Sequence, residues 1–182
     1  MKKYELTNET IEYKGKKLYR IKALIDFGNV EKGARGGFVE KEENLSMSGN
    51  AWVCDNARVC DNARVCDNAR VCGDAQVSGD AWVCDNARVC GDAQVSGDAF
   101  VSGDAFVSDN AQVDKSINYA VIKGFGTCYR STTFFRCQDK TVKVSCGCFL
   151  GTIDEFRNQV KNTRGGKIAK EYLMIADLME IH

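Results

Sequence analysis

The chain has 182 residues with 44% hydrophobic content, which is enough apolar material for a folded core and excludes a wholly disordered polymer. Its 25 basic and 25 acidic side chains cancel, so the molecule as a whole has no electrostatic bias toward nucleic acid or an anionic membrane. The N-terminus lacks the apolar core of a signal peptide, and no apolar run is long enough to span a bilayer. We therefore expect a cytoplasmic protein without membrane contact, whose ten cysteines stay reduced.

Residues 1–44 predict a β-rich N-terminal segment. The stretch 10–24 has the pattern of a β-hairpin around the turn Lys14-Gly15-Lys16-Lys17. Two glycine-punctuated stretches, Asp26–Val30 and Gly36–Val39, then lead into the next region. We expect this segment to form a β-hairpin that caps the region beginning at residue 45.

Residues 45–114 consist of an irregular first unit followed by a strict six-residue period from Ala51. Each unit reads Ala, then Trp, Arg, Gln or Phe, then Val, then Cys or Ser, and most units close with Asp-Asn or Gly-Asp. In an extended chain alternate side chains share a face, so Ala and Val point inward and the residue between them points outward. Gly, Asn and Asp accept the left-handed backbone of a tight corner. A helix would need a period of 3.6, so the pattern predicts a single-stranded β-solenoid. The valines stand at 53, 59, 65, 71, 77, 83, 89, 95, 101, 107 and 113.

Residues 115–182 predict a small C-terminal α+β unit. Strands are expected at 119–122, 132–137 and 141–145. Thr152 and Glu155 form a capping box that opens a helix, and a second helix begins at about Lys167. Because the ends of a solenoid expose unpaired strands, we expect this unit and the N-terminal segment to cover them.

Several stretches resemble the YdcK-type β-solenoid proteins that are common in phages and prophages. They are Asp26–Val30, the segment Gly36–Ser46 and the segment Gly49–Val53, and the tail from Val144 to Phe156 is similar to the ends of such proteins. The repeat also resembles the hexapeptide repeat of left-handed parallel β-helices. That resemblance implies a mainly β fold with a left-handed, three-sided coil of three units per turn. It implies no catalytic residue.

The enzymatic alternative is acyl transfer, because many hexapeptide-repeat proteins are trimeric acyltransferases with a histidine as general base between subunits. The only histidine here is the terminal His182, a poor position for an oriented base. The repeats also contain no inserted loop that could close an active site. We therefore predict no catalytic residue and no cofactor, and favour a binding function.

The cysteines suggest metal binding, but the pattern favours a structural role. With three units per turn, Cys54, Cys72 and Cys90 stack on one corner, and Cys66 and Cys84 stack on another. Serine takes the same slot four times, so the position selects a small side chain, and we predict no metal there. Each corner aspartate supplies one carboxylate per coil, too few for calcium. A zinc site stays open for the four C-terminal cysteines, which lack a C-x2-C pair, namely Cys128, Cys137, Cys146 and Cys148.

The outward residues carry the functional prediction. Taking every third unit gives three columns: Trp52, Arg70, Arg88 and Phe106; Arg58, Gln76, Gln94 and Gln112; and Arg64, Trp82 and Phe100. The first and third columns combine aromatic residues with arginine, a composition typical of contact hot spots. The alternative is that these side chains only cover the Ala and Val beneath, with the arginines balancing the corner aspartates.

The patterns predict a protein that acts by binding. The resemblance to YdcK-type proteins implies a phage or prophage accessory protein, located in the host cytoplasm if it is phage-encoded. We expect self-association as a dimer or trimer. The partner is expected to be either a host protein, such as a component of a defence system, or a small anionic ligand such as a nucleotide. Residues 45–114 carry four basic and eleven acidic groups, so the solenoid is not expected to bind nucleic acid, whereas residues 115–182 are basic.

Overall fold

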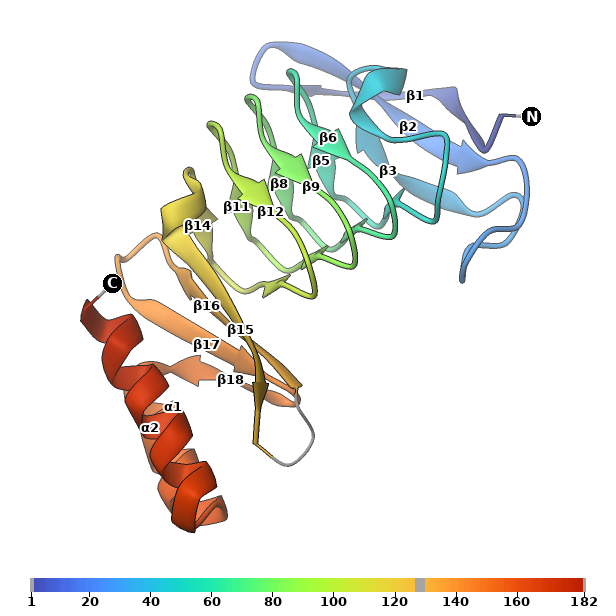
Figure 1. Ribbon diagram of the computed structural model, residues 1–182. Coiled ribbons are helices and arrows are strands. Elements are labelled where there is room, and N and C mark those ends of the chain that lie inside the picture. Colours follow the sequence, from blue (N-terminus) through green and yellow to red (C-terminus); the bar gives the residue numbers. More distant parts are fainter. Residues whose placement is uncertain (1, 127–129, 182) are drawn as a thin grey trace.

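The six-residue units coil into a solenoid with three short strands per turn. In the computed structural model, which describes residues 2–126 and 130–181, each strand consists of one outward residue and the following valine (Figure 1). Partners in the parallel pairs lie 18 residues apart, as in Arg70↔Arg88. The strands are β4 (Trp52–Val53), β5 (Arg58–Val59), β6 (Arg64–Val65), β7 (Arg70–Val71), β8 (Gln76–Val77), β9 (Trp82–Val83), β10 (Arg88–Val89), β11 (Gln94–Val95), β12 (Phe100–Val101), β13 (Phe106–Val107) and β14 (Gln112–Val113).

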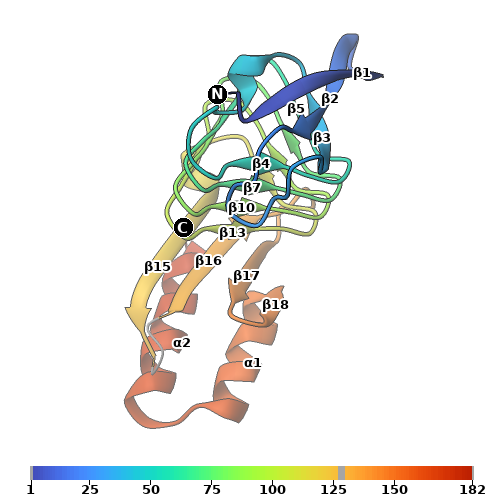
Figure 2. The same cartoon turned by 90° about the vertical axis from the view of Figure 1, so that its right-hand side faces the viewer.

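Three parallel ladders form the sides of the solenoid. Their orders are β5-β8-β11-β14, β4-β7-β10-β13 and β6-β9-β12, and Figure 2 shows the second of them stacked rung upon rung. The alanines and valines of the repeat are at most 1% exposed and form one continuous core. The predicted β-solenoid, its inward residues and its three units per turn are confirmed.

The corners are turns in which the first residue has left-handed backbone geometry. This residue is an aspartate in some corners and a glycine in others, as in Asp55 with φ of 55° and Gly73 with φ of 69°. The aspartate side chain also links coils, because Asp55 Oδ2 accepts a 3.0 Å hydrogen bond from the N–H of Gly73 one coil further on. Asp61 and Gly79 make the same contact at 3.1 Å. The corner aspartates are therefore structural.

The N-terminal cap is continuous with the first ladder. Strands β1 (Tyr4–Tyr13) and β2 (Lys16–Ala23) form the predicted hairpin, and β2 pairs with β3 (Arg35–Val39). Strand β3 then runs parallel to β5, and a 3-10 turn, η1 (Glu42–Asn44), leads to Leu45. Val39 pairs with Val59, and Leu45 pairs with Val65. The first coil thus begins at about residue 38, and the boundary expected at 45 falls inside it.

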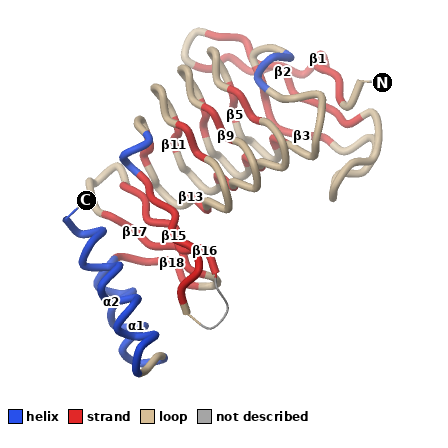
Figure 3. Tube along the Cα trace, viewed as in Figure 1, coloured by secondary structure: helices blue, strands red, loops and turns tan. Residues whose placement is uncertain are grey.

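The C-terminal unit closes the other end of the solenoid. It contains the turn η2 (Ser116–Asn118) and an antiparallel sheet of β15 (Tyr119–Phe125), β16 (Arg130–Arg136), β17 (Val142–Cys146) and β18 (Phe149–Thr152). Helices α1 (Ile153–Thr163) and α2 (Gly166–Ile181) lie on the side of the sheet that faces away from the solenoid (Figures 1 and 3). The predicted capping box is present, with Thr152 Oγ1 accepting a 3.2 Å hydrogen bond from the N–H of Glu155. Strand β18 was not predicted.

Apart from the 3-10 turns, the described chain is helical only at its C-terminal end, as the blue segments of Figure 3 show. Neither of these helices is long and apolar enough to cross a membrane.

Candidate contact surface of the solenoid

The outward residues fall into the three predicted columns. Trp52, Arg70, Arg88 and Phe106 lie in register along β4, β7, β10 and β13. Arg64, Trp82 and Phe100 do the same along β6, β9 and β12. The two caps, however, cover these columns to very different extents.

Trp52 belongs to the core and offers no surface to a partner, contrary to the sequence-based expectation. Its side chain is 3% exposed because the N-terminal cap lies over it. The rings of Tyr4 and Phe27 stand 6.4 Å and 5.4 Å from its indole in edge-on geometry. A Cβ at Gly36 would lie 2.6 Å from the indole, so the cap can close over Trp52 only with glycine at that position. In the sequence, the glycine pair at 36 and 37 was the sign that another segment packs closely at this point.

In the rest of the first column, the arginines are the main accessible side chains. Phe106 is half-buried at the other end, where its backbone N–H donates a 3.0 Å hydrogen bond to Thr133 Oγ1 of the C-terminal sheet. Arg88 is exposed and Arg70 is half-buried between these ends. This side of the solenoid therefore presents two arginines without an exposed aromatic residue at either end.

The N-terminal hairpin covers part of the second column. The Tyr13 hydroxyl is hydrogen-bonded to Gln76 Oε1, and the Arg58 guanidinium stands 5.3 Å from the centre of the Tyr13 ring. Gln76 and Gln94 are half-buried, whereas Gln112 is exposed. This column contributes to cap packing.

The third column presents a continuous exposed row of aromatic side chains. Trp82 is 40% exposed and Phe100 is 46% exposed, although both stand on a regular sheet. Their ring centres are 6.4 Å apart, and the Arg64 guanidinium lies 5.2 Å from the centre of the Trp82 ring. Among the described residues, Arg64 forms no ion pair. We call the surface formed by Arg64, Trp82 and Phe100 the aromatic face.

The two caps create a hollow at each end of the aromatic face. The hollow beside Arg64 and Trp82 has a volume of about 370 Å³ and is bounded by Glu43 and Asn44 of η1 and by Lys41 just before it. The hollow beside Phe100 has a volume of about 420 Å³ and is bounded by β15 through Tyr119 and Val121. The aromatic face is therefore a raised row between two recesses, a shape that a protein surface can match.

The cysteine columns are stacked as predicted, but the expectation of free thiols is wrong for one pair. Cys54 and Cys72 form a disulfide between successive coils, with their Cα atoms 4.8 Å apart. Cys66 and Cys84 stand close to the Asp67 carboxylate in a group of three donor atoms. Burial raises the pKa of Cys66 to about 12, and the neighbouring Asp67 carboxylate adds to the shift.

The other cysteine and histidine candidates lie partly outside the residues that the structure describes. Cys128 and His182 lie outside the described residues. Cys137, Cys146 and Cys148 belong to none of the groups of three donor atoms found in the described part of the chain.

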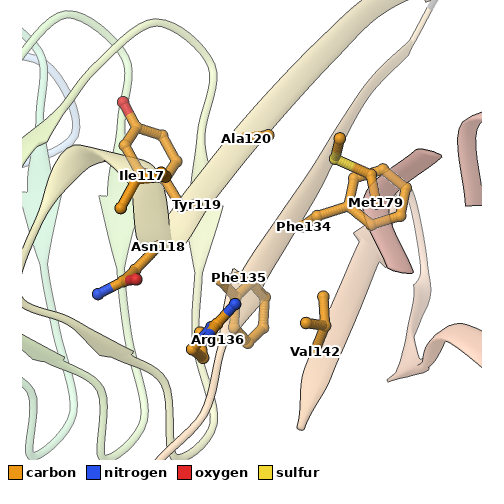
Figure 4. A pocket seen from close by; sticks show the side chains of 9 residues that line it. All are labelled: Ile117, Asn118, Tyr119, Ala120, Phe134, Phe135, Arg136, Val142 and Met179. Atoms are coloured by element: carbon orange, nitrogen blue, oxygen red, sulfur yellow. The ribbon is translucent and has the colours of Figure 1, made fainter. Parts of the chain in front are cut away.

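A small hollow lies where the C-terminal sheet meets the solenoid and the end of α2. Figure 4 shows Tyr119 turned toward the coils while Phe134 and Met179 lie together on the helix side. The accessible volume is only about 20 Å³. That space is sufficient for about one water molecule, so this hollow is a packing defect at a junction and not a ligand site.

Comparison with known protein families finds similarity within the solenoid. Residues 57–73, 63–79, 81–97 and 93–109 match the YdcK β-solenoid repeat, each over about one coil. These matches, together with the stacked parallel strands, identify the repeat region as a YdcK-like solenoid. No curated protein matches the chain.

Proposed function

We propose that this chain is a non-catalytic binding module that engages a protein partner through the aromatic face. The observation that carries the proposal is the exposure of Trp82 and Phe100 side by side on a regular sheet. Inward positions of the solenoid select small residues, but nothing in the packing of the coil requires large aromatic residues on its outside.

The composition of the aromatic face suits a contact. Aromatic residues and arginine dominate binding hot spots because they bury a large area with few rotatable bonds. Complete burial of one such aromatic side chain contributes roughly 1.5–3 kcal/mol. The corners on both sides of the row carry aspartate and asparagine side chains, which gives the apolar centre and polar rim of a protein interface.

A second copy of the chain is the first partner to test. Trp82 stands on the middle strand of the face, with Arg64 one coil before it and Phe100 one coil after it. A two-fold axis through Trp82 would place Arg64 of each copy opposite Phe100 of the other. That arrangement is self-complementary, as a two-fold interface requires, and it adds cation–π contacts between the copies.

The biological setting that we propose is based on the resemblance to YdcK-type proteins of phages and prophages. In that setting the chain is an accessory protein of the host cytoplasm, and the aromatic face engages a host protein, such as a component of a defence system, in place of a second copy. The acidic solenoid disfavours nucleic acid as the partner.

The proposal is tested by removing the aromatic row without touching the core. Trp82→Ser with Phe100→Ser should convert a dimer to a monomer in light scattering, because both side chains point outward and their valine neighbours stay buried. Gln94→Ser with Gln112→Ser, on adjacent rungs of another side of the coil, is the matched control and should leave the mass unchanged. Thermal melts of both variants check that the solenoid is intact.

A pull-down from host lysate with the same variants separates the possible partners. If the parent is a monomer and captures a host protein only when Trp82 and Phe100 are present, the partner is that host protein and not a second copy. The aromatic face would still be the binding surface. A trimeric parent would overturn the two-fold arrangement. Equal mass and equal capture for the parent and both variants would refute the aromatic face as a binding surface.

A further inference from the structure

A cavity in the C-terminal unit, remote from the aromatic face, has the features of a ligand site. It lies between the turn that joins β17 to β18 and the two helices, and its volume is about 190 Å³. Side chains from β16, β18, α1 and α2 line it together with that turn. The site therefore exists only once the whole C-terminal unit has folded.

One wall of the cavity is aromatic. Phe149, Phe156 and Tyr172 all line it. The ring centres of Phe149 and Phe156 are 5.5 Å apart, and those of Phe156 and Tyr172 are 5.8 Å apart with nearly perpendicular planes. These contacts hold the rings in a fixed arrangement, so an incoming planar group meets a preformed apolar surface.

The rim of the cavity is basic. Arg130 and Arg164 line it, both are exposed, and in the described part of the chain neither forms an ion pair. Among the described residues, none of the side chains that line the cavity is acidic. The Arg130 guanidinium lies over Gly147, where Nη1 is 2.5 Å from the position that a Cβ would take. The guanidinium groups are thus available for an anion.

We infer that this cavity binds a small aromatic anion. The ring packs against Phe149, Phe156 and Tyr172, and its carboxylate or phosphate is held by Arg130 and Arg164 at the rim. The size agrees, since an apolar cavity of about 150 Å³ in another protein holds benzene. Guanidinium groups bind carboxylates and phosphates through paired, charge-assisted hydrogen bonds, which supply the affinity that one ring lacks.

The inference is tested with phenyl phosphate as the probe, monitored by NMR of the backbone amides of the full chain. We expect saturable shifts at residues of the β17–β18 turn and of α1, with the solenoid unaffected. Inorganic phosphate, which lacks the ring, should bind at least about tenfold more weakly. Benzoate tests whether a carboxylate can replace the phosphate.

Charge removal at the rim provides the variants. Arg164→Gln lies at the exposed end of α1 and should weaken phenyl phosphate binding about tenfold without affecting the fold. Arg130→Gln should act similarly, and Lys161→Gln removes the same charge from an exposed position of α1 that does not line the cavity. Absence of saturable binding at about 10 mM probe, shifts located in the solenoid, or equal affinity in Arg164→Gln and Lys161→Gln would each overturn the inference.

Discussion

Phe134 and Phe135 are neighbours in β16, yet their rings belong to two different cores. Phe135 is 1% exposed and packs with the valines at the end of the solenoid. Phe134 is 2% exposed and packs with the helices, its ring centre 6.2 Å from that of Phe156. Alternate residues of a strand point to opposite faces, so β16 is the layer that joins the solenoid to the C-terminal unit.

This relationship predicts that the two phenylalanines protect different parts of the chain. Either substitution to alanine should lower the free energy of unfolding by roughly 3–5 kcal/mol, because each removes a fully buried aromatic ring. Phe135→Ala should increase the hydrogen-exchange rates of the backbone amides of β13 and β14 more than those of α1. Phe134→Ala should increase the rates of α1 more than those of β13 and β14. The same exchange pattern in both variants would contradict the separation of the cores.

The cysteine columns predict one position where serine is not equivalent. Cys60 is 2% exposed and packs with Leu18 and Phe38 beneath the N-terminal hairpin, whereas the other repeat cysteines are mostly less enclosed. Under reductant, serine at the other five repeat cysteines together should cost little stability, and Cys60→Ser alone should cost about 1–2 kcal/mol. Thermal melts with reductant measure both.

The Cys54–Cys72 disulfide adds a dependence on oxidation. It closes a loop of 18 residues in sequence, so in the absence of reductant the parent should be more stable than Cys54→Ser by up to about 3 kcal/mol. Reductant should remove that difference. A difference of the same size with and without reductant would show that the cysteine acts through packing alone.

Ser108 predicts a stabilising substitution. It stands one coil beyond Cys90 in the same corner column, is 5% exposed, and its Oγ has no hydrogen-bond partner in the described part of the chain. A buried hydroxyl without a partner is unfavourable, so Ser108→Ala should raise the free energy of unfolding by about 1 kcal/mol. Ser102→Ala, at a half-buried corner, is the control and should have no such effect. A loss of stability in Ser108→Ala would show that the hydroxyl is satisfied in solution.

Lys3 predicts a dependence of stability on pH. Its side chain is enclosed by the N-terminal cap, where Nζ donates a 3.0 Å hydrogen bond to the carbonyl oxygen of Ala51 and stands 5.0 Å from the centre of the Phe27 ring. Burial lowers the pKa of Lys3 from 10.5 to about 8. Between these two values the unfolded chain holds a proton that the folded chain has released, so the free energy of unfolding should rise with pH across that window.

The shift in the pKa of Lys3 also sets the size of the pH effect, and Lys3→Met is the control that lacks the amine. The free energy of unfolding of the parent, relative to that of Lys3→Met, should rise by up to roughly 3 kcal/mol from pH 8 to pH 10.5. Below pH 8 this difference should not change with pH. Groups that titrate in both proteins cancel in the difference. Direct NMR titration of Lys3 Cε should give a midpoint of about 8. A midpoint close to the ordinary value of 10.5 would show that the cap does not exclude water from this amine.

The sequence by itself determined the solenoid. Its strict period places every valine and its preceding alanine inward, and aspartate or glycine at the first corner position allows the left-handed turn. The three columns of outward residues and the stacking of cysteines have the same cause. Each coil contains three units, so residues 18 apart in sequence lie above one another. Val39 and Leu45 obey the period too, but a longer interval before Val53 concealed the first coil.

Only the tertiary structure decided which outward residues remain accessible. Trp52 and Trp82 occupy equivalent positions in the repeat, yet the N-terminal cap buries the first, whereas the second is 40% exposed. The cavity between Arg130 and Arg164 likewise requires a strand and a helix end that are distant in sequence. A local repeat specifies which way a side chain points, whereas its exposure depends on where non-repeating segments pack, and that is set by long-range contacts that the period does not encode.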